Sequence, residues 1–272
     1  MTTSIKKPHQ MITARELARS AFTELRSGWK RYVAIVAIVI VPVDLLALTS
    51  SVTGEDPTLS TYSLIVSLIM NVALIWAIVQ KDHTGVIPRV GAAYYEGSIA
   101  IVRFFLVSAA LVLMLAPAAL GGAIYVAANT AGINSAAPVA EQLIIGIACL
   151  LLALPSFHLL IRFGLALVAV VDGGMRPLAA LRYARRLTFG KYWRLAGRYI
   201  NLFLLIILIA IPISIGTFIL AFLKLVPVAT LFFQLATTFT ALPIMNMYLL
   251  HLYHDIEPKS KEPEPTASEE AA

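Results

Sequence analysis

The feature that most constrains this chain is a series of six long apolar segments. They lie at about residues 32–50, 62–80, 99–127, 142–171, 199–223 and 226–253. A membrane-spanning helix needs about 20 mostly apolar residues, so each segment is long enough to cross a bilayer. With 59% hydrophobic and 13% charged residues, the chain is also more apolar than soluble domains are. The sequence therefore predicts an all-α polytopic membrane protein.

The distribution of lysine and arginine predicts the orientation of these segments. Basic residues are frequent before residue 32 and in the connector 172–198, and two more lie in the connector 81–98. The connectors 51–61 and 128–141 contain none. Because basic connectors stay on the cytoplasmic side of a membrane, both termini are predicted to be cytoplasmic.

Three shorter segments are predicted to be amphipathic helices that lie in the plane of the membrane. The first begins at a capping box, Thr13 with Glu16, and is predicted to end at Gly28. The second covers 88–97 and the third covers 177–190, and each has a proline at its first position. Each of the three precedes two apolar segments. The sequence thus predicts six transmembrane helices arranged as three hairpins, each with an in-plane helix before it.

The domain boundaries follow from the same pattern. Residues 1–11 are predicted to be flexible, 12–255 to form the six-helix transmembrane domain, and 256–272 to be a disordered acidic tail. Two of the apolar segments are longer than one span requires, and they contain Pro117 and Pro155. Because proline removes a helical hydrogen bond, kinks are predicted at both prolines.

The stretch "RYARRLTFGKYWRLAGRY" is strongly basic and contains no acidic residue. On a helix, Arg182, Arg185 and Arg186 share one face, while small and apolar residues form the opposite face. The residues predicted to lie at the membrane interface are Arg182, Arg185, Arg186, Lys191, Trp193, Arg194 and Arg198. They predict either general attraction to anionic lipid or recognition of one anionic headgroup. Orientation of the spans already accounts for the charge, so nucleic acid is not a predicted partner.

Three ionisable side chains inside the apolar segments are candidates for a functional role. They are Asp44, His158 and Arg162, and His158 lies one helical turn from Arg162. Such residues are costly inside a membrane and are retained for pairing or for function. The depths of Asp44 and Arg162 predict an ion pair in the bundle interior, which either joins two hairpins or lines a pathway for a substrate or proton. Asn71 and Asn246 are predicted to form hydrogen bonds between helices.

The signatures of common enzymes are missing from the sequence. There is no P-loop, GxSxG, HExxH or dinucleotide-binding motif, so no catalytic residue and no cofactor is predicted. His251, His254 and Asp255 lie close together at the end of the last apolar segment and just after it, but no other Cys or His is related to them by ligand spacing. No metal site is therefore predicted.

The segment 175–197, "MRPLAALRYARRLTFGKYWRLAG", carries a pattern that resembles a known family. The pattern is a proline, an "AL" pair, a basic helix and then T-x-G-x-x-W, matched here by Pro177, Ala180, Leu181, Thr188, Gly190 and Trp193. It is similar to the glycerophosphoryl diester phosphodiesterase membrane-domain family and its bacterial relatives. The closing "LLHLYHDIE" is similar to that family's ending at Tyr253 and Asp255 and departs from it at Ile256 and Glu257.

The resemblance covers most of residues 12–257 and implies a membrane fold in a bacterial plasma membrane. In the family, the phosphodiesterase is a separate soluble domain fused to the membrane module, and no such domain is predicted here. The predicted function is therefore that of a non-catalytic scaffold or lipid-interacting module, with anionic lipids and other membrane proteins as partners. The alternative is a small transporter or channel subunit that uses the intramembrane charges.

Overall fold

The computed structural model describes residues 13–50, 57–130 and 139–257, which are 91% helix and contain no strand. An all-α fold is therefore confirmed for these residues. Residues 1–11, predicted to be flexible, and 258–272, most of the tail predicted to be disordered from residue 256, lie outside the described ranges. Ile256, predicted to begin that tail, is instead the last residue of α11 and is buried. In chain order the helices are α1 (Ala14–Ser50), α2 (Pro57–Thr84), α3 (Val90–Gly97), the 3₁₀ turn η1 (Ser98–Ala100), α4 (Ile101–Met114), α5 (Ala116–Thr130), α7 (Val139–Phe163), α8 (Ala166–Asp172), α9 (Pro177–Thr188), α10 (Tyr192–Phe222) and α11 (Val226–Ile256).

Five helical segments of the described chain are long and apolar enough to cross a membrane. They are Tyr62–Thr84, Val90–Met114, Gln142–Asp172, Tyr192–Phe222 and Val226–Ile256. These segments indicate a multi-pass membrane protein. The predicted segment 32–50 is not among the five and forms the second half of α1. The six-helix hairpin arrangement is therefore not confirmed.

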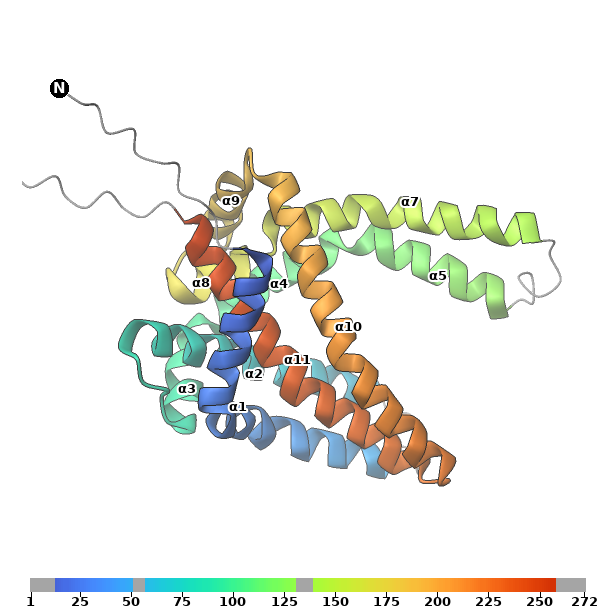
Figure 1. Cartoon of the computed structure of the whole chain (residues 1–272), viewed down its shortest axis with the longest axis horizontal. Helices are drawn as coiled ribbons and strands as arrows, with labels where there is room; N and C mark the ends of the chain where they lie inside the picture. The colour runs from blue at the N-terminus through green and yellow to red at the C-terminus, as the bar shows by residue number, and fades with distance from the viewer. Residues whose placement is uncertain (1–12, 51–56, 131–138, 258–272) are drawn as a thin grey trace, which may run out of the picture.

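The helices form a hub from which two groups extend, namely an arm and the outer halves of α1, α2, α10 and α11 (Figure 1). The arm is the pair α5 and α7, which run side by side away from the other helices. In the hub, the first part of α1, the ends of α2 and α11 and the start of α10 pack with α4, α8 and α9. The largest fully buried side chains of the hub include Tyr32, Phe104, Leu165, Leu195, Tyr248 and Tyr253. Much of the surface of α5, α7 and α10 away from the hub is exposed and apolar, as is typical of helices in contact with lipid.

The first helix confirms one prediction and corrects another. The capping box is formed, because the Thr13 amide donates to Glu16 Oε2 at 3.0 Å and the Glu16 amide donates to Thr13 Oγ1 at 3.3 Å. The predicted end at Gly28 is wrong, because α1 continues to Ser50 and only bends on the way (Figure 1). Gly28 serves close packing instead, since a Cβ at this position would collide with the side chain of Ile87.

The other two segments predicted as amphipathic helices form separate short helices. They are α3 and α9, which correspond to the predicted ranges 88–97 and 177–190. The turn after α9 contains Gly190 with a φ of +75°, a conformation that favours glycine. Helix α10 then begins at Tyr192, before the predicted start of the fifth span at residue 199. The second half of the basic stretch is therefore helical and continues into the hub.

Two interruptions separate the arm from the hub. The first is at Leu115, between α4 and α5 and two residues before Pro117, which confirms the kink predicted there. The second follows Phe163, whereas α7 passes through Pro155 without a break. The break in this apolar segment therefore lies at Gly164, and the kink predicted at Pro155 is not accompanied by an interruption of the helix. Without a side chain at Gly164, the end of α7 can lie directly against α10.

One hydrogen bond joins the two helices of the arm near the first interruption. Ser156 of α7 is buried, and its Oγ accepts a hydrogen bond from the Ala118 amide of α5 at 3.1 Å. The amides of a first helical turn have no carbonyl partner within their own helix. Because an amide without a partner is costly in lipid, this contact stabilises the pairing of α5 with α7.

Candidate functional site

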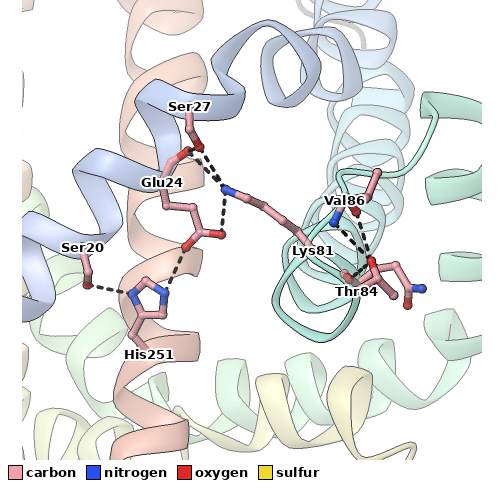
Figure 2. Close-up of polar contacts among 8 residues, drawn as sticks. Ser20, Glu24, Ser27, Lys81, Thr84, Val86 and His251 are labelled. Atoms are coloured by element: carbon pink, nitrogen blue, oxygen red, sulfur yellow. Dashed lines mark hydrogen bonds and ion pairs between the residues drawn. The ribbon is translucent and has the colours of Figure 1, made fainter.

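A polar network joins α1, α2 and α11 inside the hub (Figure 2). Glu24 lies at its centre: Oε1 is 3.2 Å from Lys81 Nζ, and Oε2 is 3.0 Å from His251 Nε2. Ser20 Oγ lies 3.0 Å from His251 Nδ1, and Lys81 Nζ also donates to Ser27 Oγ at 3.1 Å. Figure 2 shows the Lys81 side chain reaching from α2 toward α1. A single carboxylate thereby connects three helices.

The surroundings of Glu24 favour its charged form. Burial would raise its pKa, but the hydrogen bond from His251 and the positive charge of Lys81 outweigh burial and lower the pKa below its ordinary value of 4.5. The network lines a shallow groove of about 590 Å³, to which Arg19 and Asp82 also contribute. The groove therefore carries charges of both signs around a carboxylate that remains ionised at neutral pH.

Glu24→Gln is expected to lower the free energy of unfolding by about 1–2 kcal/mol at neutral pH, because Lys81 and His251 lose a charged partner. A carboxyl whose pKa is lowered by folding stabilises the protein above its unfolded pKa. That contribution is lost as the pH falls through the folded pKa. Thermal unfolding in detergent at about pH 7 and about pH 3 measures the difference between wild type and variant, which should shrink in acid. Glu96→Gln, at an exposed carboxylate, is the control and should change stability by less than about 0.5 kcal/mol. A difference of equal size at both pH values would contradict the assignment.

A second polar cluster lies where α2, α8 and α11 end. Asp172 Oδ1 is 3.1 Å from His83 Nε2, and Asp172 Oδ2 is 3.4 Å from His254 Nε2. The other ring nitrogen of His254, Nδ1, is 3.2 Å from Asp82 Oδ2. The side chain of His83 is 53% exposed, whereas that of Asp172 is 11% exposed. The cluster of His83, Asp172 and His254 is therefore open to solvent on the side of His83.

Arg198, predicted to lie at the membrane interface, is buried in the hub instead. Its Nη1 donates to Asp255 Oδ2 at 2.7 Å, and the two side chains are 8% and 1% exposed. The Tyr248 hydroxyl donates to the Arg198 carbonyl at 3.0 Å. The reason is helical phase, because Arg198 lies on the same buried face of α10 as Leu195 and Leu202. An arginine three or four residues from buried leucines on a helix faces the core with them.

The remaining predicted interface residues lie mostly at the surface. The exposed ones, which we call the α9 basic surface, are Arg182, Arg185, Arg186, Trp193 and Arg194. Trp193 is 84% exposed and directly precedes Arg194 in the first turn of α10. Lys191 is half-buried, and its Nζ donates to the Ile256 carbonyl at the end of α11, at 3.3 Å. Lys191 therefore caps a helix, while the α9 basic surface combines charge with an aromatic side chain.

A second basic surface, which the sequence analysis did not predict, lies beside α1. It is a groove of about 540 Å³, here called the α1 groove, lined by Arg26, Ser27, Gly28, Trp29, Lys30, Arg31, Lys81, Gly85, Val86 and Ile87. Four of these lining residues are basic and none is acidic. Arg31 is fixed by donating to the Ile87 carbonyl at 2.6 Å, and Trp29 is half exposed beside it. The groove is therefore a concave positive surface next to the apolar half of α1.

The three ionisable residues predicted to share the membrane interior do not come together. Within the described residues no salt bridge joins Asp44 to Arg162, and one carboxylate oxygen of Asp44 is buried without a hydrogen-bond partner. The expected pair does not form because the arm that carries α7 diverges from the second half of α1 (Figure 1). His158 instead packs against a tyrosine ring of α10. Asn246 donates to Asn71 at 2.9 Å, which confirms the predicted hydrogen bond between helices.

Local sequence patterns indicate neither polar network, because the members of each network are far apart along the chain. Ser20 and His251, for example, are 231 positions apart, and Asp172 and His254 are 82 apart. A signal was nevertheless present. Lys81 and His83 follow directly after the second apolar segment, and Asp172 follows the fourth. Polar residues that end several spans on the same side of a membrane lie at one level and can meet there.

The chain matches no family model, no curated protein and no solved structure.

Proposed function

We propose that the protein is a non-catalytic, lipid-interacting module of the bacterial inner membrane that binds lipid headgroups of net negative charge. The observation that carries the proposal is the α1 groove, where Arg26, Lys30 and Arg31 line one concave space together with Lys81, whose ammonium is paired with Glu24. Basic residues next to a transmembrane helix attract anionic lipid by about 1 kcal/mol each. Trp29, half exposed at the same groove, is the type of side chain that anchors at the membrane–water boundary.

The proposal includes six spans, with the hub at the cytoplasmic side. The α1 groove and the α9 basic surface both belong to the hub, whereas the turn between α10 and α11 carries a single basic residue, Lys224. This asymmetry supports cytoplasmic termini. The second half of α1 is then one more span in addition to the five long apolar segments, which gives six in total. The resemblance to the glycerophosphoryl diester phosphodiesterase membrane-domain family, through residues 175–197, is part of the same proposal. It concerns the membrane module and not the hydrolytic reaction.

Native mass spectrometry tests the proposal on protein purified in mild detergent and equilibrated with equal amounts of phosphatidylglycerol and phosphatidylcholine. The wild type is expected to retain the anionic phosphatidylglycerol preferentially. The variant Arg26→Gln/Lys30→Gln removes two contributions of about 1 kcal/mol each. Because 1.4 kcal/mol corresponds to a tenfold change, the preference is expected to fall by about tenfold or more.

Two further variants make this experiment specific. Arg15→Gln/Arg19→Gln removes the same charge from exposed positions of α1 outside the α1 groove and should leave the preference nearly unchanged. The triple variant at Arg182, Arg185 and Arg186, each changed to Gln, measures whether the α9 basic surface forms a second site. Equal retention of both lipids by the wild type would overturn the proposal. An equal loss of lipid preference in the Arg15/Arg19 control would show that the preference reflects general electrostatic attraction and not binding in the α1 groove.

Transport is the second candidate function, because a pocket of about 380 Å³ lies between α1, α2, α10 and α11. Its polar lining includes Ser67, Asn71 and Thr237, and the buried Thr237 hydroxyl has no hydrogen-bond partner. The ionisable residues expected to serve a transport pathway, Asp44 and Arg162, are not among the lining residues. Apart from these residues and Thr238, the lining is apolar, so lipid binding is the better-supported function.

A further inference from the structure

The geometry points to a divalent metal site, of the kind that takes zinc, formed by His83, Asp172 and His254. One ligand atom from each of the three residues lies within 4.8 Å of the other two. The residues come from the ends of α2, α8 and α11, so a bound ion would hold three helix ends together. This inference concerns a different part of the hub from the α1 groove and does not depend on lipid binding.

The distances from the Asp172 carboxylate to the two imidazoles are close to the spacing of ligands around a tetrahedral zinc ion, and one ligand atom from each residue lies within 4.8 Å of the others. Zinc bonds of about 2.0–2.1 Å to nitrogen and oxygen place neighbouring ligand atoms about 3.3 Å apart. Here Asp172 Oδ1 lies 3.1 Å from His83 Nε2, and the other carboxylate oxygen, Oδ2, lies 3.4 Å from His254 Nε2. Two imidazoles and one carboxylate are ligands that zinc uses, with water in the fourth position. The exposed side of His83 gives the ion and its water a route from solvent.

Asp82 orients His254 in the way that metal-binding histidines are usually oriented. Its Oδ2 lies 3.2 Å from His254 Nδ1 and can accept the N–H of that nitrogen. The lone pair on Nε2 then faces Asp172. Histidine ligands commonly donate their other ring N–H to a carboxylate in this manner. When the neutral His254 ring carries its proton on Nδ1, its Nε2 is a hydrogen-bond acceptor. Nε2 then faces a second acceptor, Asp172 Oδ2, at 3.4 Å, and a cation bound between the two atoms interacts favourably with both.

Asp172 also lacks the partner that Glu24 has. Among the described residues no lysine or arginine lies within ion-pair distance of Asp172, whereas Glu24 has Lys81. Its Oδ1 is buried and makes no hydrogen bond, although His83 Nε2 is 3.1 Å away. A buried carboxylate oxygen without a donor is costly. A metal ion coordinated by Asp172 Oδ1 and His83 Nε2 removes this cost.

Zinc titration of the full-length protein in detergent tests the site. The protein is purified through a tag that contains no histidine, treated with a chelator and desalted, and then titrated with zinc chloride alone. Bound zinc is counted by elemental mass spectrometry after a second desalting. One ion per chain is expected, together with a higher unfolding temperature. Cobalt in place of zinc should give the visible absorption of a tetrahedral site.

Variants separate a metal site from a purely ionic cluster held by protonated histidines. Asp172→Asn and His254→Ala are expected to abolish stoichiometric zinc binding, and Asp82→Asn to weaken it by about 10–100-fold. His158→Ala, at a histidine outside the cluster, should bind as the wild type does. If a buried substitution unfolds the hub, His83→Ala at the half-exposed ligand gives the same test. Absence of stoichiometric zinc in the wild type, or its retention in all the ligand variants, would overturn the site.

Discussion

Replacing Asp255 with asparagine is expected to lower the free energy of unfolding by about 3–5 kcal/mol, because it removes the charge that neutralises the buried Arg198 guanidinium. The two groups lie 2.7 Å apart with side chains that are 8% and 1% exposed, so water cannot replace the carboxylate. Thermal unfolding of the protein in detergent, followed by tryptophan fluorescence, measures the loss. The effect should exceed that of any surface charge in the same helix.

Two comparisons make the Asp255 result specific. Arg194→Gln removes an exposed arginine from α10 and should change stability by less than about 0.5 kcal/mol. The double variant Arg198→Met/Asp255→Leu removes both charges and should recover most of the loss, because apolar replacement of a buried ion pair is often close to neutral. Wild-type stability in Asp255→Asn would show that the pair does not hold the hub together.

Gly164→Ala is expected to destabilise the protein by about 2–3 kcal/mol through overpacking. A Cβ at Gly164 would lie 2.7 Å from the Leu160 carbonyl oxygen and 2.7 Å from the Tyr199 hydroxyl. The first of these contacts is to the backbone, so it cannot be relieved by rotating a side chain. Unfolding in detergent of the variant against the wild type measures the cost at the junction of arm and hub.

The matched control for Gly164 is a glycine that has space around it. Nothing lies within 4 Å of a Cβ added at Gly197, so Gly197→Ala should gain up to about 1 kcal/mol from helix propensity. Tyr199→Phe removes a buried hydroxyl that has no hydrogen-bond partner and should recover part of the loss when combined with Gly164→Ala. Equal effects of alanine at the two glycines would contradict the packing argument.

Local signals in the sequence predicted the local structure well. The capping box of Thr13 and Glu16 requires only residues within one helical turn of each other, and the structure forms it. The ranges of α3 and α9 follow from a proline at the start and a change of polarity at the end. The positions of the apolar helices likewise follow from hydropathy alone, because lipid excludes polar backbone and side chains.

Features that depend on tertiary contacts could not be predicted from local pattern. Gly28 looks like a helix end, but it is a point of close packing that Ile87 defines from another segment. The ion pair expected between Asp44 and Arg162 assumed that all spans form one bundle, whereas α7 belongs to a separate arm. The depth of a residue in the membrane gives its position along the membrane normal only, and two residues at the same depth can lie far apart in the membrane plane. Which helices are neighbours is decided by packing that hydropathy does not encode.

The network around Glu24 has a consequence for the order in which the membrane protein is assembled. Lys81 is 57 positions from Glu24 and can pair with it once the second helix is made. His251 is 231 positions from Ser20, and at about 5–20 residues per second a ribosome needs roughly 10–50 s to reach it. The start of α1 therefore cannot form its contacts with His251 until nearly the whole membrane domain has been synthesised. The start of α1 is the first part of the hub to be synthesised, and its packing against α11 is among the last contacts of the hub to form.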